Sequence, residues 1–300
     1  MIDLHTHSTA SDGSFSPASL IAEAEKRGLS TLALTDHDTI GGLKEAEKAA
    51  LERGIRFIPG IELEIAWNQE ATSKNNGGEF HLLGLGISRP TPGFVTAIEE
   101  LARRRKERNL EIVDKMNKAG IIASYDEIRS LVIGPNAEGS KDEVFSFGRL
   151  HFADFLVKRK LVKNHEQAFI RYLGRGKPFF FPKEGLEFEQ AADIIKQSGG
   201  IAVLAHPMSL YAAWGKLPDL IKNLKERGLD GLEAWHPNAK VSSCRRLEEL
   251  GKKLGLYITA GSDFHGEARP DRKLGITAGG KKIDETLLYS PHSPLIESKS

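Results

Sequence analysis

Histidine and carboxylate side chains recur in this sequence at the points where short apolar runs end. His5 and His7 stand two residues apart, and in an extended chain residues i and i+2 point to the same side, so both imidazoles can bind one ion. Asp263 and His265 repeat this spacing. Imidazole and carboxylate ligands suit Zn, Mn or Fe. The candidate metal ligands are His5, His7, Asp12, His37, Glu62, His81, His206, Asp263 and His265.

The number of candidate ligands indicates more than one ion. A histidine after a strand is by itself a weak signal, but polar groups placed repeatedly beyond apolar strands would be costly if they were buried without partners. Nine ligands exceed what one ion can bind. They fit two or three divalent ions (Mn, Fe or Zn), with a carboxylate bridging a pair as in two-metal phosphoryl chemistry.

The elements that must position these ligands alternate between strand-like and helix-like patterns. Such β-α repeats favour a parallel sheet with outer helices, here a barrel. The carboxyl ends of parallel barrel strands meet at one face, so ligands that follow different strands can converge there. Strands are expected at 2–5, 31–35, 55–65, 80–87, 201–205, 231–234 and 257–260, and a hairpin-like loop at 68–78. Helices are expected at 16–28, 42–53, 188–197, 217–227 and 241–254.

Residues 92–181 have a different sequence pattern, with long helical runs at 95–118, 125–131, 148–160 and 165–173. We interpret this block as a helical insertion that covers the active site. It enters after the strand bearing His81 and returns before the strand bearing His206, and we expect both strands to end at the metal face. The predicted division is a barrel of residues 1–91 and 182–270, the insertion 92–181, and a C-terminal tail 271–300. The chain from Glu267 onward is expected to be partly disordered.

Bulk composition excludes several classes of protein. Lys and Arg total 42 and Asp and Glu total 41 among 300 residues, so a surface that coats nucleic acid is not expected, although a local basic patch remains open. The adjacent residues Arg103, Arg104 and Arg105 are interpreted as an exposed helix face. The single cysteine, Cys244, excludes an internal disulfide and a thiolate metal site. Without a signal-peptide pattern or an apolar run of membrane-spanning length, a cytoplasmic location is expected.

The ligand motifs together resemble the polymerase and histidinol phosphatase (PHP) domain family. The resemblance runs from His5 to about Gly266, in order, and is greatest to stand-alone PHP phosphoesterases that act on nucleotides or short RNA ends. It implies a distorted (β/α)7 barrel with an inserted helical subdomain, of the α/β class, and up to three metals. The motifs are His5-Thr6-His7, Ser11-Asp12-Gly13, Thr35-Asp36-His37-Asp38, Pro59-Gly60-Ile61-Glu62, His81, Ala205-His206-Pro207 and Ser262-Asp263-Phe264-His265-Gly266.

Carried over residue by residue, the resemblance implies three ligand sets that share one bridging carboxylate, Glu62. The first set is His5, His7, Glu62 and Asp263, the second is Glu62, His81 and His206, and the third is Asp12, His37 and His265.

The insertion also resembles that subgroup, in Gly148-Arg149-Leu150-His151-Phe152-Ala153 and in Tyr172-Leu173-Gly174-Arg175-Gly176-Lys177-Pro178. Arg149 can donate two parallel hydrogen bonds to a phosphate, and His151 can carry a proton. The subgroup usually has proline where Leu150 stands. The turn at Lys177 lacks the full pattern of a nucleotide-binding loop, so Lys177 is expected only near the substrate. His236 follows another strand and either contacts substrate, supports a ligand or simply packs.

These residues predict a metal-dependent phosphoesterase that hydrolyses nucleoside monophosphates or 3′,5′-bisphosphates, with Glu62, Arg149 and His151 as catalytic residues. A 5′-to-3′ exoribonuclease on short RNA is the alternative. An amidohydrolase would often need a carboxylated lysine, and no lysine follows a predicted strand. A non-catalytic metal-binding accessory domain would have lost ligands, and none is lost. The expected partner is a nucleotide or a single-stranded RNA end rather than duplex DNA or a membrane, and the oligomeric state stays open.

Overall fold

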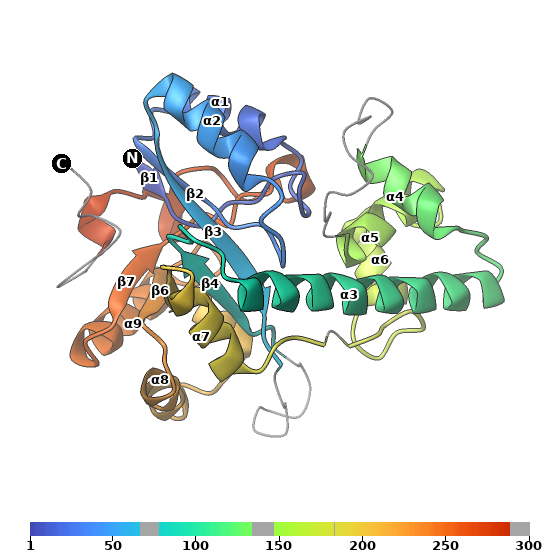
Figure 1. Cartoon of the computed structure of the whole chain (residues 1–300). Helices are drawn as coiled ribbons and strands as arrows, with labels where there is room; N and C mark the ends of the chain where they lie inside the picture. The colour runs from blue at the N-terminus through green and yellow to red at the C-terminus, as the bar shows by residue number, and fades with distance from the viewer. Residues whose placement is uncertain (67–77, 134–146, 183, 289–300) are drawn as a thin grey trace.

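The computed structural model describes residues 1–66, 78–133, 147–182 and 184–288. Within them, seven strands form one sheet in the order in which they occur along the chain (Figure 1). The predicted loop 68–78 lies outside the described residues, apart from Gly78. The strands are β1 (Ile2–Asp3), β2 (Thr31–Leu34), β3 (Arg56–Glu64), β4 (His81–Leu85), β5 (Ile201–Leu204), β6 (Gly231–Trp235) and β7 (Tyr257–Ala260).

The sheet curls into a nearly closed barrel, which confirms the predicted fold class. The chain after β1 meets the chain after β7, where the Asp263 N–H donates to His5 O at 2.9 Å and the His7 N–H donates to Phe264 O at 2.9 Å. The expectation of parallel strands is wrong for β4, which is antiparallel to both β3 and β5. No described helix separates β3 from β4, and a direct return of this kind gives antiparallel neighbours, whereas a parallel pair needs a crossover.

Helices pack around the barrel because each presents an apolar stripe to it. In α1 the Ser16 side chain accepts from the Ser19 N–H and Pro17 occupies the first turn, as the sequence predicts. In Figure 1, α1 and α2 lie together above the barrel strands, and α7, α8 and α9 lie below them. These helices are α1 (Pro17–Lys26), α2 (Leu43–Arg53), α7 (Phe188–Gln197), α8 (Leu217–Glu226) and α9 (Val241–Lys253).

The inserted block has a hydrophobic core of its own. The first half of α3 packs on the barrel through Phe94 and Leu101, whereas Ile112 and Met116 in its second half pack against Phe152 in a separate cluster. We call that second half, together with α4, α5, α6 and η2, the helical lobe; it stands beside the barrel in Figure 1. The elements are α3 (Pro92–Lys118), α4 (Tyr125–Ile133), α5 (Arg149–Lys158), α6 (His165–Ala168) and the π-helical turn η2 (Phe169–Leu173).

The insertion does not leave the barrel at the face that carries the candidate ligands. His81 is the first residue of β4, and the last residue, Leu85, pairs with Gly60 and with Ile201 at the start of β5. The expectation that both flanking strands end at the metal face is therefore wrong for β4. Contacts nevertheless bring α3 and the helical lobe beside the ligands, because Arg105 forms an ion pair with Asp38 and Arg149 Nη2 lies 3.6 Å from Glu79 Oε1.

The C-terminal chain is ordered further than its composition suggests. Leu274 and Ile283 are buried, and the Gly275 N–H donates to Asp3 Oδ2 at 2.8 Å. Disorder from Glu267 is therefore wrong for residues 267–288, because two apolar anchors and one buried carboxylate fix the segment; residues 289–300 lie outside the described ranges. Its short elements are η4 (Gly266–Ala268), β8 (Ile276–Thr277), η5 (Ala278–Gly280), β9 (Lys281–Lys282) and η6 (Glu285–Leu287). Within the described ranges, no helix has the length and apolar character that a membrane span requires.

Candidate metal centre

The candidate ligands meet at one end of the barrel. Most of them follow a strand, and His81, which begins β4, reaches the same edge because β4 runs antiparallel. The side chains form four overlapping groups, and within each group the potential ligand atoms lie within 4.8 Å of one another. The groups are His7, Asp12, His37 and His265; His5, His7 and Asp263; His5, Glu62 and His206; and His37, Glu62 and His81.

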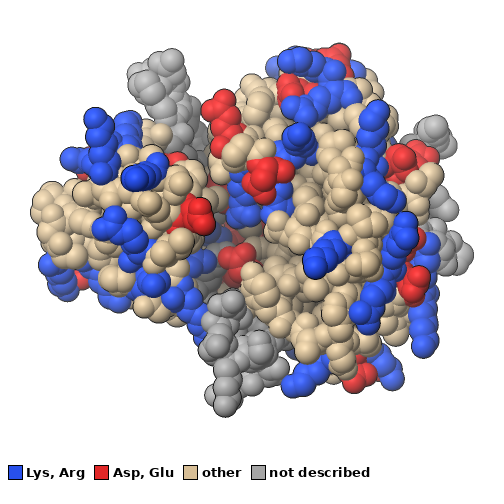
Figure 2. All heavy atoms as spheres, turned by 180° about the vertical axis from the view of Figure 1, so that it is seen from behind, with Lys and Arg blue, Asp and Glu red and all other residues tan. Residues whose placement is uncertain are grey.

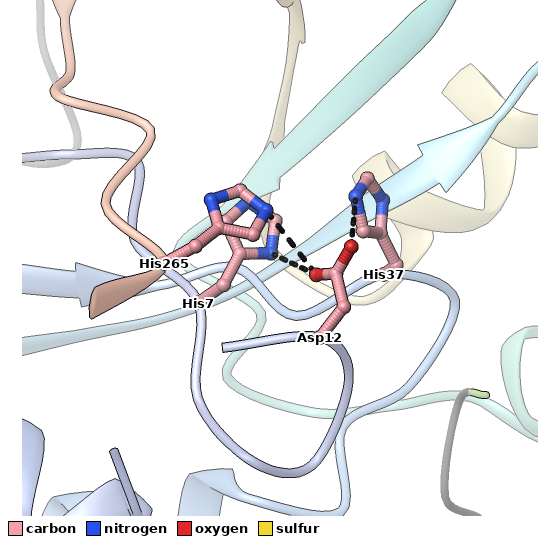
Figure 3. Close-up of side chains that lie close together, drawn as sticks. All are labelled: His7, Asp12, His37 and His265. Atoms are coloured by element: carbon pink, nitrogen blue, oxygen red, sulfur yellow. Dashed lines mark ion pairs between the residues drawn. The ribbon is translucent and has the colours of Figure 1, made fainter. Parts of the chain in front are cut away.

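The first group contains the whole of one ligand set implied by the resemblance. Figure 3 shows the imidazoles of His7, His37 and His265 turned toward the carboxylate of Asp12. The Asp12 oxygens lie 3.2 Å from His265 Nε2 and 3.9 Å from His37 Nε2. His7 is the additional member, since its Nδ1 lies 3.9 Å from Asp12 Oδ1. Three imidazoles and a carboxylate are a donor set suited to one transition-metal ion.

Glu62 belongs to two of the other three groups, and its side chain is 1% exposed. Its Oε1 is 2.8 Å from His81 Nδ1 and 2.9 Å from His206 Nε2. Its Oε2 faces the opposite set of rings, which is the geometry that a bridging carboxylate requires. The ring nitrogens within 3.1 to 3.3 Å of Oε2 belong to His5, His7 and His37.

The charges and unsatisfied atoms of this end fit divalent metals. Although burial alone would raise the pKa of Glu62, the imidazoles of His37 and His81 hold it well below its usual value. Burial would also raise the pKa of Asp12, but the imidazole of His265 holds the pKa of that carboxyl well below its usual value. Burial lowers the pKa of His37, which leaves a neutral ring with a lone pair to donate. Within the described part of the chain, the buried ligand atoms that make no hydrogen bond are His7 Nδ1, Asp12 Oδ1, Glu62 Oε2 and His265 Nε2. Such atoms are costly unless a cation satisfies them.

Two supporting carboxylates were missed by the sequence reasoning. Glu64 Oε2 lies 3.0 Å from His81 Nε2, and Glu233 Oε1 lies 3.0 Å from His5 Nδ1. The second Glu233 oxygen accepts the His206 N–H at 2.7 Å. Carboxylates behind metal-binding imidazoles fix the ring orientation and tautomer. The available signal was the Glu62-x-Glu64 spacing, which repeats the i, i+2 pattern of His5 and His7; Glu233 stands inside an apolar strand.

The backbone is strained where it turns into this site. Asp38, His206 and Asp263 have φ values of 51°, 28° and 52°, in the left-handed region that residues other than glycine rarely adopt. They are three of the five such residues in the described chain, and the others are Lys160 and Tyr211. Strain of this kind persists where the surrounding structure enforces it, which is typical of functional sites.

The structure places the substrate-binding candidates on the helical lobe and at its edge. Arg149 Nη2 lies 3.6 Å from Glu79 Oε1, and its guanidinium stacks 5.4 Å from the centre of the Phe180 ring. His151 is 5% exposed, and its Nδ1 accepts the Gly148 N–H at 2.9 Å, so the neutral ring carries its proton on Nε2. Burial lowers the pKa of His151. Lys177 is exposed on the predicted tight turn, which the Lys177 N–H closes onto Gly174 O at 3.0 Å.

His236 lies behind a candidate ligand. The ring is buried, and its Nε2 is 3.3 Å from Asp263 Oδ2 and 3.3 Å from Arg272 Nη1. It also lines a cavity next to the centre. Of the alternatives left open by the sequence, support of a ligand agrees with the contact to Asp263, and substrate contact remains a prediction.

Two of the three arginines of the supposed exposed face are partly buried. Arg103 is exposed and pairs with glutamates on its own helix, but the Arg104 side chain is 33% exposed, and the Arg105 side chain is 11% exposed and forms an ion pair with Asp38. Burial, together with the nearby charge of Arg108, lowers the pKa of Arg105 to about 9. Burial, together with the nearby charge of Arg149, lowers the pKa of Arg108 to about 10. Both remain cationic at neutral pH and add positive potential beside the centre. The sequence signal was helical spacing, since Leu101, Arg105, Arg108 and Ile112 share one face of α3.

Comparison with known proteins agrees with this fold and site. Residues 3–132 match the PHP domain model. The chain is 38% identical over 264 residues to a 5′-3′ exoribonuclease of Haemophilus influenzae, covering 88% of this chain and 89% of the relative. It is 33% identical over 276 residues to a 3′,5′-nucleoside bisphosphate phosphatase of Chromobacterium violaceum, covering 92% of this chain and 91% of the relative. The chain therefore belongs to the PHP domain family, and it is a metal-dependent phosphoesterase.

A solved structure supports the same assignment of fold. It is described as an amidohydrolase from Chromobacterium violaceum with bound sulfate and no metal. It superposes with a TM-score of 0.79 at 32% identity, covering 92% of this chain and 90% of that one. The barrel and its insertion therefore occur together in a related protein.

Proposed function

We propose that the protein hydrolyses phosphate monoesters of nucleotides, such as nucleoside monophosphates or 3′,5′-bisphosphates. The observation that carries this proposal is that three of the four ligand groups contain Glu62 or Asp12, beside a lobe that offers arginine and histidine. Phosphate is an anion that arginine binds bidentately and that a pair of divalent metals can hold. Both features face the same end of the barrel, because Arg149 contacts Glu79, which lines the hollow over Glu62.

We assign the first ligand set to His5, His7, Glu62 and Asp263, the second to Glu62, His81 and His206, and the third to Asp12, His37 and His265. Divalent metals such as Mn, Fe or Zn would supply Lewis-acid stabilisation of the phosphoryl oxygens and a nucleophilic water at neutral pH. Arg149 then binds the phosphoryl oxygens and neutralises their developing charge. A neutral His151 presents its Nε2–H to the leaving oxygen. Arg105 and Arg108 attract the anionic substrate toward the centre.

The shape of the centre supports a single phosphate group on a small or thin substrate. The hollow over Glu62 has a volume of about 40 Å³ and is lined by His37, His81 and Glu79 among others. The surface seen in Figure 2 carries basic and acidic side chains interspersed, with a hollow between the helical lobe and the barrel. Duplex binding normally relies on an extended basic surface. We therefore propose a nucleotide or a single-stranded end as substrate, and no action inside duplex DNA.

A second candidate function uses the same chemistry on a longer substrate. The Haemophilus influenzae relative, identical at 38% of aligned positions, is a 5′-3′ exoribonuclease. Cleavage of short RNA from a phosphorylated 5′ end would place a phosphodiester, rather than a terminal monoester, over Glu62. The two functions differ in the phosphate ester that is cleaved, so a comparison of substrates distinguishes them.

The experiment compares three substrates at equal phosphate concentration with Mn²⁺ added: an adenosine 3′,5′-bisphosphate, a 5′-phosphorylated short RNA and a circular duplex DNA. Phosphate release from the bisphosphate, faster than nucleotide release from the RNA, supports the monoesterase. The reverse order supports the exoribonuclease. Rapid nicking of the circle, with both small substrates intact, contradicts both functions.

A further inference from the structure

A second cavity adjoins the hollow over Glu62. It has a volume of about 320 Å³ and lies between the turn η3 (Pro207–Leu210) and the loop that follows β6. His206, Ser209 and Asn238 line both the cavity and the hollow. The two spaces therefore lie next to each other, close enough for a molecule whose phosphate occupies the hollow to reach the cavity.

The lining of this cavity suits a neutral, flat group better than a second phosphate. Met208, Pro207, Ala239 and Leu247 supply apolar surface, and Asn238 supplies a carboxamide. No lysine or arginine is among the described residues that line it. Its ionisable members already have partners in the centre: Glu233 with His5, His206 with Glu62, and His236 with Asp263.

Tyr211 lines this cavity and is unusual in its exposure and in its backbone conformation. It is 57% exposed, which is high for a large aromatic side chain, and its φ is 50°. A left-handed tyrosine is strained, and such strain is typical of ligand-binding positions. The turn that holds it begins directly after His206, so the ring is placed by the same segment that places a candidate ligand.

We propose that this cavity is a nucleobase subsite, in which the base stacks on Tyr211 and meets the carboxamide of Asn238 while the phosphate lies over Glu62. Base stacking on an exposed aromatic ring is tolerant of base identity, because every base has a π-face. Arg149 of the helical lobe lies 3.6 Å from Glu79, which lines the hollow and not the cavity. The subsite makes the enzyme select nucleotides over sugar phosphates without a base. This inference rests on the proposed function.

The test compares adenosine 5′-monophosphate with ribose 5-phosphate, which differ only by the base. In the wild type, KM for ribose 5-phosphate should exceed KM for the nucleotide by roughly tenfold or more, as expected for one stacked base. Tyr211→Leu removes the ring and should bring this ratio near one, whereas Tyr211→Phe should keep it. Leu51→Ala, at an 84% exposed position on α2 outside the centre, is the matched control and should keep the wild-type ratio.

A KM ratio that Tyr211→Leu leaves at the wild-type value overturns the subsite, as does a wild-type ratio near one. Should neither compound be hydrolysed, the proposed function fails on its own. Calorimetric Kd values for the same two compounds then decide the subsite by the same comparison: a ratio lost in Tyr211→Leu upholds it, and an unaltered ratio overturns it.

Discussion

The candidate metal end of the barrel and the helical lobe position their polar side chains in different ways. The barrel end gathers its candidate ligands from residues at or near the ends of several strands, and Glu64 and Glu233 contact the rings of His81 and His5 from behind. The helical lobe presents Arg149 and His151 from the first turn of one helix, above a core of its own that includes Phe152. We therefore expect metal binding and substrate binding to depend on different packing units, so that mutations separate them.

The largest effect should come from Glu62→Gln, because that side chain contacts rings of several ligand groups. We expect kcat/KM on phosphate substrates to fall by roughly a thousandfold or more, with loss of bound metal. Elemental analysis should find about two or three ions per chain in the wild type and fewer in the variant. Glu52→Gln, on the exposed face of α2, is the control. An active Glu62→Gln protein with full metal content would show that no bridging occurs.

Glu64→Gln should weaken metal binding without removing a ligand. The amide keeps the size of the side chain but loses the charge that faces His81 Nε2 at 3.0 Å. Loss of such support typically lowers metal affinity or activity by about 10- to 100-fold. Chelator competition measures the affinity, and saturating metal should restore most of kcat. If metal affinity stays at the wild-type value, Glu64 does not support the centre.

Arg149→Ala tests the other side of the comparison. Removing one charge-assisted contact to phosphate should cost about 2 kcal/mol, or roughly 30-fold in kcat/KM. Metal content should stay at the wild-type value, since Arg149 belongs to the helical lobe. Lys158→Ala, at the other end of the same helix and exposed, is the control. Loss of metal in Arg149→Ala would mean that the two regions are not separable.

The smallest effect should come from Lys177→Ala. This lysine is exposed on the turn next to Leu173, whose carbonyl oxygen lies 3.5 Å from Arg149 Nη1. An exposed charge near an anionic substrate should change KM by only about threefold at low salt, and added salt should screen that difference. Kinetics at two ionic strengths check this. A salt-independent loss of much larger size would mean that Lys177 contacts the phosphate directly.

The sequence predicts the positions of helices and strands well, because the spacing of apolar residues and the capping residues are features of neighbouring positions in the chain. The strand expected at 257–260 and the helix expected at 188–197 occur at those residues. The direction of β4 was not predictable, because a short apolar run indicates a buried strand without indicating whether it lies parallel or antiparallel to its neighbours. The burial of Arg105 was missed since the face of α3 that docks is decided by its partners rather than by charge. Ligand types were recognisable at strand ends, whereas the supporting Glu233 lies within a strand and becomes visible only in space.

The strained turns at the barrel end have a consequence for how long the protein survives. Asp38, His206 and Asp263 occupy unfavourable backbone conformations, each costing on the order of 1–3 kcal/mol, next to a dense group of buried ionisable side chains. A cation that binds the native centre and not the unfolded chain offsets this cost by mass action, by about 2.7 kcal/mol at a hundredfold excess over its Kd. Metal supply in the surrounding solution then sets the unfolded fraction, and with it the exposure of the chain to proteases.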